Sequence, residues 1–119
     1  GNIQKQEAWN FFREGVCMLE FNVKKDGAAA RVVFSGRVDN EGSAVFQQAF
    51  DKLLESGEQS VVLDLKGLEF INSSGIGKLL IFHKKMVNSG RTSRIEGLSE
   101  EIFTLFKAIR LDKIIDMKG

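Results

Sequence analysis

The 119-residue sequence contains no proline, no tyrosine and a single cysteine, Cys17. One cysteine excludes an internal disulfide framework and suits a reducing compartment. The sequence also has a single histidine, His83, and one histidine with one cysteine does not make a cluster of metal ligands. No apolar run approaches the ~18 residues that span a bilayer, and the start, GNIQKQEAW, is not a secretory signal. We therefore expect a cytoplasmic protein without membrane insertion, metal or cofactor.

An excess of charge of one sign is also missing. There are 17 Lys and Arg against 16 Asp and Glu, for a net charge of +1. Such a balance gives no reason to expect direct binding to nucleic acid or to an anionic membrane. A content of 43% hydrophobic and 28% charged residues is typical of one globular domain.

The first residues differ in pattern from the rest. We expect residues 1–17 to form an N-terminal extension, in which Gly1 is consistent with a residue left by tag cleavage, and residues 18–119 to form the domain. Trp9, Phe11 and Phe12 predict either a short helical turn docked on the domain or a partly ordered extension.

Alternation and turn signals predict the first strands. Apolar residues alternate with polar ones from Leu19 to Lys24, as in a half-buried strand. Asp26-Gly27 then predicts a hairpin turn. A second strand follows over residues 30–35, with Gly36 as a break. The near-continuous apolar run from Ser60 to Leu65 predicts a strand buried on both faces.

Helical periodicity predicts three helices. The first runs from Glu41 to Ser56 and the second from about Gly75 to Ser89-Gly90. The third follows a weak strand over residues 92–96 and has Ser99 as its N-cap. The expected buried face of the second helix consists of Ile76, Leu79, Leu80, His83, Met86 and Val87. That of the third consists of Ile102, Phe103, Leu105, Phe106 and Ile109.

Ile114 and Ile115 predict a last short strand, so the element order is ββαβαβαβ. Strands separated by helices imply a mixed, mostly parallel sheet covered by helices, an α/β fold.

The most informative segment is VVLDLKGLEFINSSGIG, residues 61–77, where a strand leads through a loop into a helix. Ser73 and Ser74 place hydroxyls beside the positive end of that helix. One interpretation is simple capping by either serine. Motifs for a P-loop, a dinucleotide fingerprint and a hydrolase elbow each fail, at Asn72, Leu80 and Ile71 respectively. His83 lies about three turns away and suits a packed, hydrogen-bonded role, so we expect no enzyme and no catalytic residue.

The string LDLKGLEFINSSGIGKLL resembles the signature of STAS domains, the sulfate-transporter and anti-sigma-factor-antagonist family. The resemblance covers about residues 18–117 and includes Gly36 with Asp39 before the first helix. A chain of this size resembles the bacterial antagonists. The resemblance implies binding to a serine kinase that doubles as an anti-sigma factor, phosphorylation of a serine, and reversal by a serine phosphatase.

By position in the motif, the phosphoryl acceptor is Ser73, with Ser74 the less favoured neighbour, in a switch loop of Asn72, Ser73, Ser74 and Gly75. Two positions depart from the family pattern. Asn72 replaces the aspartate common in phosphorylated antagonists, and Lys66-Gly67 replaces a hydroxyl residue. A phosphorylation-independent scaffold or transporter accessory subunit therefore stays open, as does a small-ligand-binding module.

The partner surface is predicted on the second helix and the loop before it. Residues 71–94 contain no Asp or Glu but five cations: Lys78, Lys84, Lys85, Arg91 and Arg94. Helical spacing places Lys78, Ile81 and Lys85 on the side of the helix away from the core, with Phe82 nearby. Such an arrangement offers a partner protein an apolar contact surrounded by charges that speed association. An ordinary solvated face is the alternative. Arg37 and Asp39, from the loop before the first helix, complete the predicted surface, and the sequence leaves open a weak homodimer.

Overall fold

The computed structural model describes residues 5–10 and 19–119, with side chains from residue 19 onward. One six-stranded sheet carries the fold, and its strands lie in chain order, β1-β2-β3-β4-β5-β6. The strands are β1 (Lys5–Asn10), β2 (Leu19–Asp26), β3 (Ala29–Val38), β4 (Ser60–Ile71), β5 (Thr92–Glu96) and β6 (Asp116–Met117). The helices are α1 (Asn40–Ser56), α2 (Ser73–Asn88), α3 (Glu100–Ala108) and a 3-10 turn, η1 (Leu111–Lys113).

Strand direction follows from how the strands are joined. The short connection between β2 and β3 makes an antiparallel hairpin, and β1 pairs antiparallel with β2. The helical crossovers through α1 and α2 make β3, β4 and β5 parallel. Gly27 occupies the predicted hairpin turn with a φ of 61°, which glycine adopts without steric cost. The predicted mixed, mostly parallel α/β order is confirmed.

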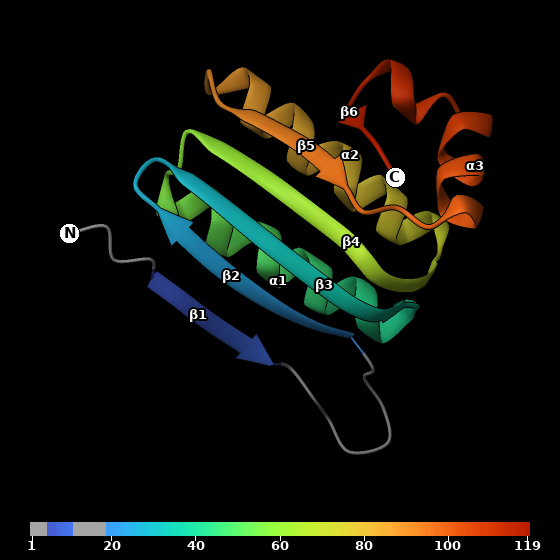
Figure 1. The fold of residues 1–119 in the computed structure, drawn as a ribbon, viewed down its shortest axis with the longest axis horizontal. Helices are drawn as coiled ribbons and strands as arrows, with labels where there is room; N and C mark the ends of the chain where they lie inside the picture. Colours follow the sequence, from blue (N-terminus) through green and yellow to red (C-terminus); the bar gives the residue numbers. More distant parts are fainter. Residues whose placement is uncertain (1–4, 11–18) are drawn as a thin grey trace.

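Helices α1 and α2 lie side by side against one face of the sheet (Figure 1). Inward residues of the strands alternate with residues that face away, such as Val62 and Asp64 on β4, which are only partly buried. The prediction that this strand is buried on both faces is therefore wrong, because no helix covers the second face of the described sheet.

Aromatic side chains fill the layer between the sheet and the two helices. Phe34 from β3 packs edge-on against Phe46 of α1, with 4.8 Å between ring centroids. Phe50 of α1 stacks on Phe82 of α2 at 4.5 Å. All four rings are at most 1% exposed. These contacts hold α1 and α2 against each other and hold α1 against the sheet.

The strands that lead to the helix starts are longer than predicted. Gly36 does not end β3 but continues it with a φ of 118° at an irregular pairing with β4. Strand β4 likewise continues past Leu65 to Ile71. The last strand is Asp116–Met117 rather than Ile114-Ile115, because Leu111–Lys113 forms a 3-10 turn first.

Two expected helix faces are narrower than the periodicity suggests. Val87 on α2 is 54% exposed, and Leu105 and Ile109 at α3 are 39% and 47% exposed. Helix α3 lies at one end of the sheet rather than over it (Figure 1), so only Ile102 and Phe106 of this helix are buried.

The predicted helical turn at Trp9 is wrong, since Lys5–Asn10 is a strand of the sheet. Phe11 and Phe12 lie outside the described residues. Within the described ranges, the structure has no helix that is both long and apolar enough to cross a membrane.

Candidate functional site

The start of α2 is capped by Asn72 and by neither serine. The Asn72 side chain accepts a hydrogen bond from the Gly75 amide at 2.8 Å, and its own amide nitrogen donates to Oδ1 of Asn40 at 3.3 Å. The backbone amide of Asn72 donates to the carbonyl of Val38 at 2.9 Å. Asn72 therefore ties α2 to the end of β3 and to the start of α1.

The two serines of the motif have different surroundings. Both residues are exposed, but the Ser74 hydroxyl lies 2.9 Å from the hydroxyl of Ser43, which is 3% exposed. Within the described part of the chain, no hydrogen bond involves the Ser73 hydroxyl. Ser73 therefore presents an unengaged hydroxyl to solvent at the first position of α2.

Close packing brings the starts of the two helices together. Asp39 caps α1 by accepting from the Gly42 amide at 2.9 Å. A Cβ on Gly42 would overlap the carbonyl oxygen of Arg37, and a Cβ on Gly75 would lie 2.5 Å from Cγ1 of Val38. Both positions therefore need glycine. The predicted switch loop and the predicted Asp39 loop are neighbours in the structure.

Phe70 is a part of this region that the sequence analysis missed. Its ring is 39% exposed, and the guanidinium of Arg37 lies over it at 4.5 Å from the centroid. Glu69 and Phe70 are both exposed, so they break the alternation of β4 just before the motif. The break in alternation is the sequence signal that could have identified Phe70 as a surface residue. An aromatic ring paired with an arginine is typical of binding surfaces.

The outer face of α2 holds three of the four side chains predicted there. Ile81 is 53% exposed, Lys85 is exposed and Lys78 is half-buried. The prediction for Phe82 is wrong, because its ring is 1% exposed and stacks on Phe50. Helix α2 rests on α1 through Phe82, so this residue belongs to the core.

His83 is packed and hydrogen-bonded, as expected. Its Nδ1 lies 2.7 Å from the hydroxyl of Ser93. Burial lowers the pKa of His83, and a hydrogen bond to the carbonyl of Ile114 opposes part of that shift. The side chain thus joins α2 to β5 and to the C-terminal segment, away from the serines of the motif.

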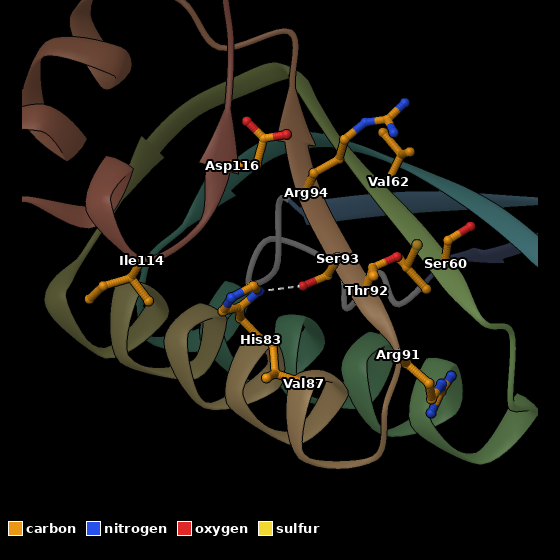
Figure 2. Close-up of a pocket in the computed structure, with 11 residues that line it drawn as sticks. Ser60, Val62, His83, Val87, Arg91, Thr92, Ser93, Arg94, Ile114 and Asp116 are labelled. Atoms are coloured by element: carbon orange, nitrogen blue, oxygen red, sulfur yellow. Dashed lines mark hydrogen bonds between the residues drawn. The ribbon is translucent and has the colours of Figure 1, made fainter.

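A pocket of about 390 Å³ lies beside His83, and residues of α2, β4 and β5 are among those that line it (Figure 2). The apolar side chains of Val87 and Ile114 line the end of the pocket next to His83, and Arg94 and Asp116 line the other end. None of the switch-loop residues lines it. In the described ranges there is no group of three or more His, Cys, Asp or Glu that could hold a metal ion.

Comparison with known proteins identifies the family. The model of the STAS domain family described as "Mlab, STAS domain" matches residues 21–116. The chain therefore belongs to the STAS domain family. It is 26% identical over 101 residues to the anti-sigma-B factor antagonist of Bacillus subtilis strain 168, covering 85% of this chain and 92% of that protein.

Two solved structures show the same fold at low identity. An anti-sigma factor antagonist from Mycobacterium paratuberculosis matches with a TM-score of 0.77 and 19% identity, covering 85% of this chain and 86% of that one. The Bacillus cell fate determinant SpoIIAA in its phosphorylated form matches with a TM-score of 0.65 and 13% identity, covering 83% and 91%. The chain is thus a STAS domain that resembles anti-sigma factor antagonists.

Proposed function

We propose that this protein is an anti-sigma factor antagonist, not an enzyme, and that phosphorylation of Ser73 switches its binding to a serine kinase that is also an anti-sigma factor. A serine phosphatase would restore the unphosphorylated form. The observation that carries the proposal is the contrast at the start of α2. Ser73 is exposed and unengaged among the described residues, whereas the Ser74 hydroxyl is bonded to the buried Ser43.

Electrostatics at this helix start support a phosphoryl group on Ser73. The first turn of α2 contains no acidic residue, and its cap, Asn72, is neutral. A phosphoryl group adds about −1.5 to −2 charges, which the amide groups and dipole at a helix N-terminus stabilise. The same charge would be unfavourable against a partner surface fitted to a neutral serine, so modification would weaken binding.

The partner surface consists of Ser73, Lys78, Ile81 and Lys85 on α2 together with Arg37 and Asp39 before α1. Ile81 supplies an exposed apolar side chain between two cations. Phe70, with Arg37 over its ring, adds a second apolar group beside the motif. An acidic partner surface with an apolar centre would be complementary to this arrangement.

The test uses a histidine-kinase-like anti-sigma factor encoded in the same genome, incubated with Mg²⁺-ATP and the full chain. Mass spectrometry should locate the phosphate on Ser73 in the wild type and in a Ser74→Ala variant. A Ser73→Ala variant should bind the kinase but take up no phosphate, and Ser73→Asp should bind more weakly. Phosphate on Ser74 alone would contradict the proposal. Binding without any phosphate transfer would indicate a phosphorylation-independent scaffold or transporter accessory subunit instead.

The surface itself is tested by a matched pair on one helix. Ile81 and Val87 are 53% and 54% exposed on α2, so Ile81→Glu and Val87→Glu make similar changes at different places. Only Ile81→Glu should impair kinase binding. Lys78→Glu should mainly slow association and reduce its salt dependence. Unchanged binding by an Ile81→Glu, Lys78→Glu double variant of normal stability would place the contact elsewhere, for example on the loop of residues 36–41.

A further inference from the structure

The sheet has an open edge beside the pocket shown in Figure 2. Strand β6 pairs only with Arg94 and Ile95 of β5, so among the described residues no strand lies beside Thr92 and Ser93 on the side of β5 away from β4. Ser93 faces α2, where it meets His83, and its neighbours along the strand face the other way. The pocket is lined by residues of both kinds and therefore passes around the open edge. Its volume of about 390 Å³ is in the range of sites for small molecules.

One end of the pocket offers apolar contacts. Val87 and Ile114 line this end and are 54% and 50% exposed. His83 holds the end together, because its Nδ1 lies 2.7 Å from the hydroxyl of Ser93 and its ring also bonds to the carbonyl of Ile114. An apolar group of a ligand placed here would remove both exposed side chains from water, which favours binding.

The other end offers two opposite charges. Arg94 and Asp116 are register partners on β5 and β6, so their Cα atoms lie about 4.8 Å apart. Arg94 donates from Nε to Glu96 at 2.9 Å, and among the residues that the structure describes neither of its Nη groups is hydrogen-bonded. The Asp116 carboxylate makes no ion pair or hydrogen bond with the described residues. Both side chains are exposed and can turn toward one bound group.

We infer that this pocket binds an α-amino acid with a large apolar side chain. The ligand carboxylate accepts hydrogen bonds from the Nη groups of Arg94, and the ligand ammonium donates to Asp116. Its side chain passes the open edge of β5 and contacts Val87 and Ile114. A ligand with only a negative charge would meet the Asp116 carboxylate, and one with only a positive charge would meet Arg94, so a ligand that carries both charges is the most complementary. Arg91, which also lines the pocket, already donates to three carbonyls at the end of α1.

The main chain adds a donor in the middle of the pocket. The Thr92 amide donates to the carbonyl of Gln59, on the side of β4, at 2.9 Å. Because amide groups alternate in direction along a strand, the Ser93 amide faces the open edge. It can therefore donate to the ligand and report its binding.

Titration of the full chain with L-phenylalanine, followed by the NMR shifts of the backbone amides, tests this without any partner protein. The shifts should be largest at Ser93, Arg94 and Asp116, with a Kd of about 1 mM or below. Phenylpropionate lacks the ammonium and phenylethylamine lacks the carboxylate, so each should bind about tenfold more weakly. Glycine, which lacks the apolar side chain, should cause no shifts at these residues.

Two variants test the charged contacts. Arg94→Gln and Asp116→Asn should each weaken the binding of phenylalanine about tenfold, because each removes one contact with a charged group. Lys84→Gln changes an exposed cation of α2 outside the pocket and should leave the Kd unchanged. The amide spectrum of each variant without ligand shows whether the variant is folded.

Three results would overturn the inference. The first is no binding of phenylalanine, leucine or tryptophan at about 10 mM. The second is equal affinity for phenylalanine and for either of the analogues that carry one charge. The third is an unchanged Kd in folded Arg94→Gln or in folded Asp116→Asn, which would place the bound amino acid elsewhere on the chain.

Discussion

The hydroxyl oxygens of Ser43 and Ser74 lie 2.9 Å apart and join the first turns of α1 and α2. Ser43 is buried, so the loss of either hydroxyl leaves a polar group with its partner missing. We expect Ser43→Ala and Ser74→Ala each to lower the free energy of unfolding by about 1 kcal/mol.

A double-mutant cycle measured by urea denaturation isolates this contact. The double variant should be little less stable than either single one, because the second substitution removes a group that is already without its partner. Full additivity of the two losses would show that the hydroxyls do not stabilise each other. Ser73→Ala serves as the control and should change stability by less than about 0.5 kcal/mol.

Two glycines of α2 make a second, matched test. A Cβ at position 75 would lie 2.5 Å from Val38 Cγ1 and 2.9 Å from Ile71 Cγ1, whereas nothing lies within 4 Å of a Cβ at position 77. Gly75→Ala should destabilise the fold by about 1–3 kcal/mol through overpacking. Gly77→Ala should stabilise it by up to about 1 kcal/mol because alanine favours the helix.

Thermal and urea unfolding of the two variants provide the measurement. A neutral or stabilising effect of Gly75→Ala would mean that β3 and the end of β4 do not pack against α2 as closely as described.

Arg91 stabilises the end of α1. Its guanidinium donates to the carbonyls of Leu53 at 2.9 Å, Leu54 at 3.2 Å and Glu58 at 2.7 Å, and the last turn of α1 has no basic residue of its own. Arg91→Ala should cost about 2 kcal/mol, as expected for hydrogen bonds from a charged donor.

Arg91→Lys should recover only part of that stability. The lysine ammonium keeps the positive charge near the C-terminus of α1, but it lacks the planar guanidinium whose N–H groups donate to several carbonyls at once. Denaturation of both variants beside Lys84→Ala, an exposed cation of α2, checks the claim. Equal stability of all three would contradict it.

His83 makes stability depend on pH below neutrality. Burial lowers its pKa in the folded protein, so the unfolded chain takes up the proton more readily than the folded one. The contribution of the neutral imidazole is complete above the unfolded pKa of about 6.5 and is lost as pH falls towards the folded pKa.

Denaturation midpoints measured between about pH 7.5 and pH 5 should fall in the wild type and should fall less in a His83→Gln variant. Identical pH profiles for the two proteins would exclude His83 as the cause.

Sequence periodicity and local chemistry were sufficient for the order of the elements from Leu19 onward and for several of their ends. Ser99 caps α3, as predicted, and α1 ends at Ser56, as predicted, through contacts between residues close in the chain. The place of Ser73 at a strand-to-helix junction also followed from the motif alone.

Other features depended on packing between distant segments. Periodicity gives a broad apolar stripe on α2, but only the position of α1 decides that Phe82 is buried while Val87 is exposed. The same holds for α3, where few neighbouring elements leave Leu105 and Ile109 exposed. The uncovered second face of the sheet likewise follows from where the helices pack.

The sequence by itself determined that Ser73 and Ser74 stand at the start of a helix. Only the tertiary structure distinguished them, because Ser43 is 31 residues away from Ser74 and meets it only when α1 and α2 pack together. It also brought Arg37 over Phe70 from the neighbouring strand. Contacts of this kind have no periodic signature, since they depend on how whole elements are placed rather than on spacing along the chain.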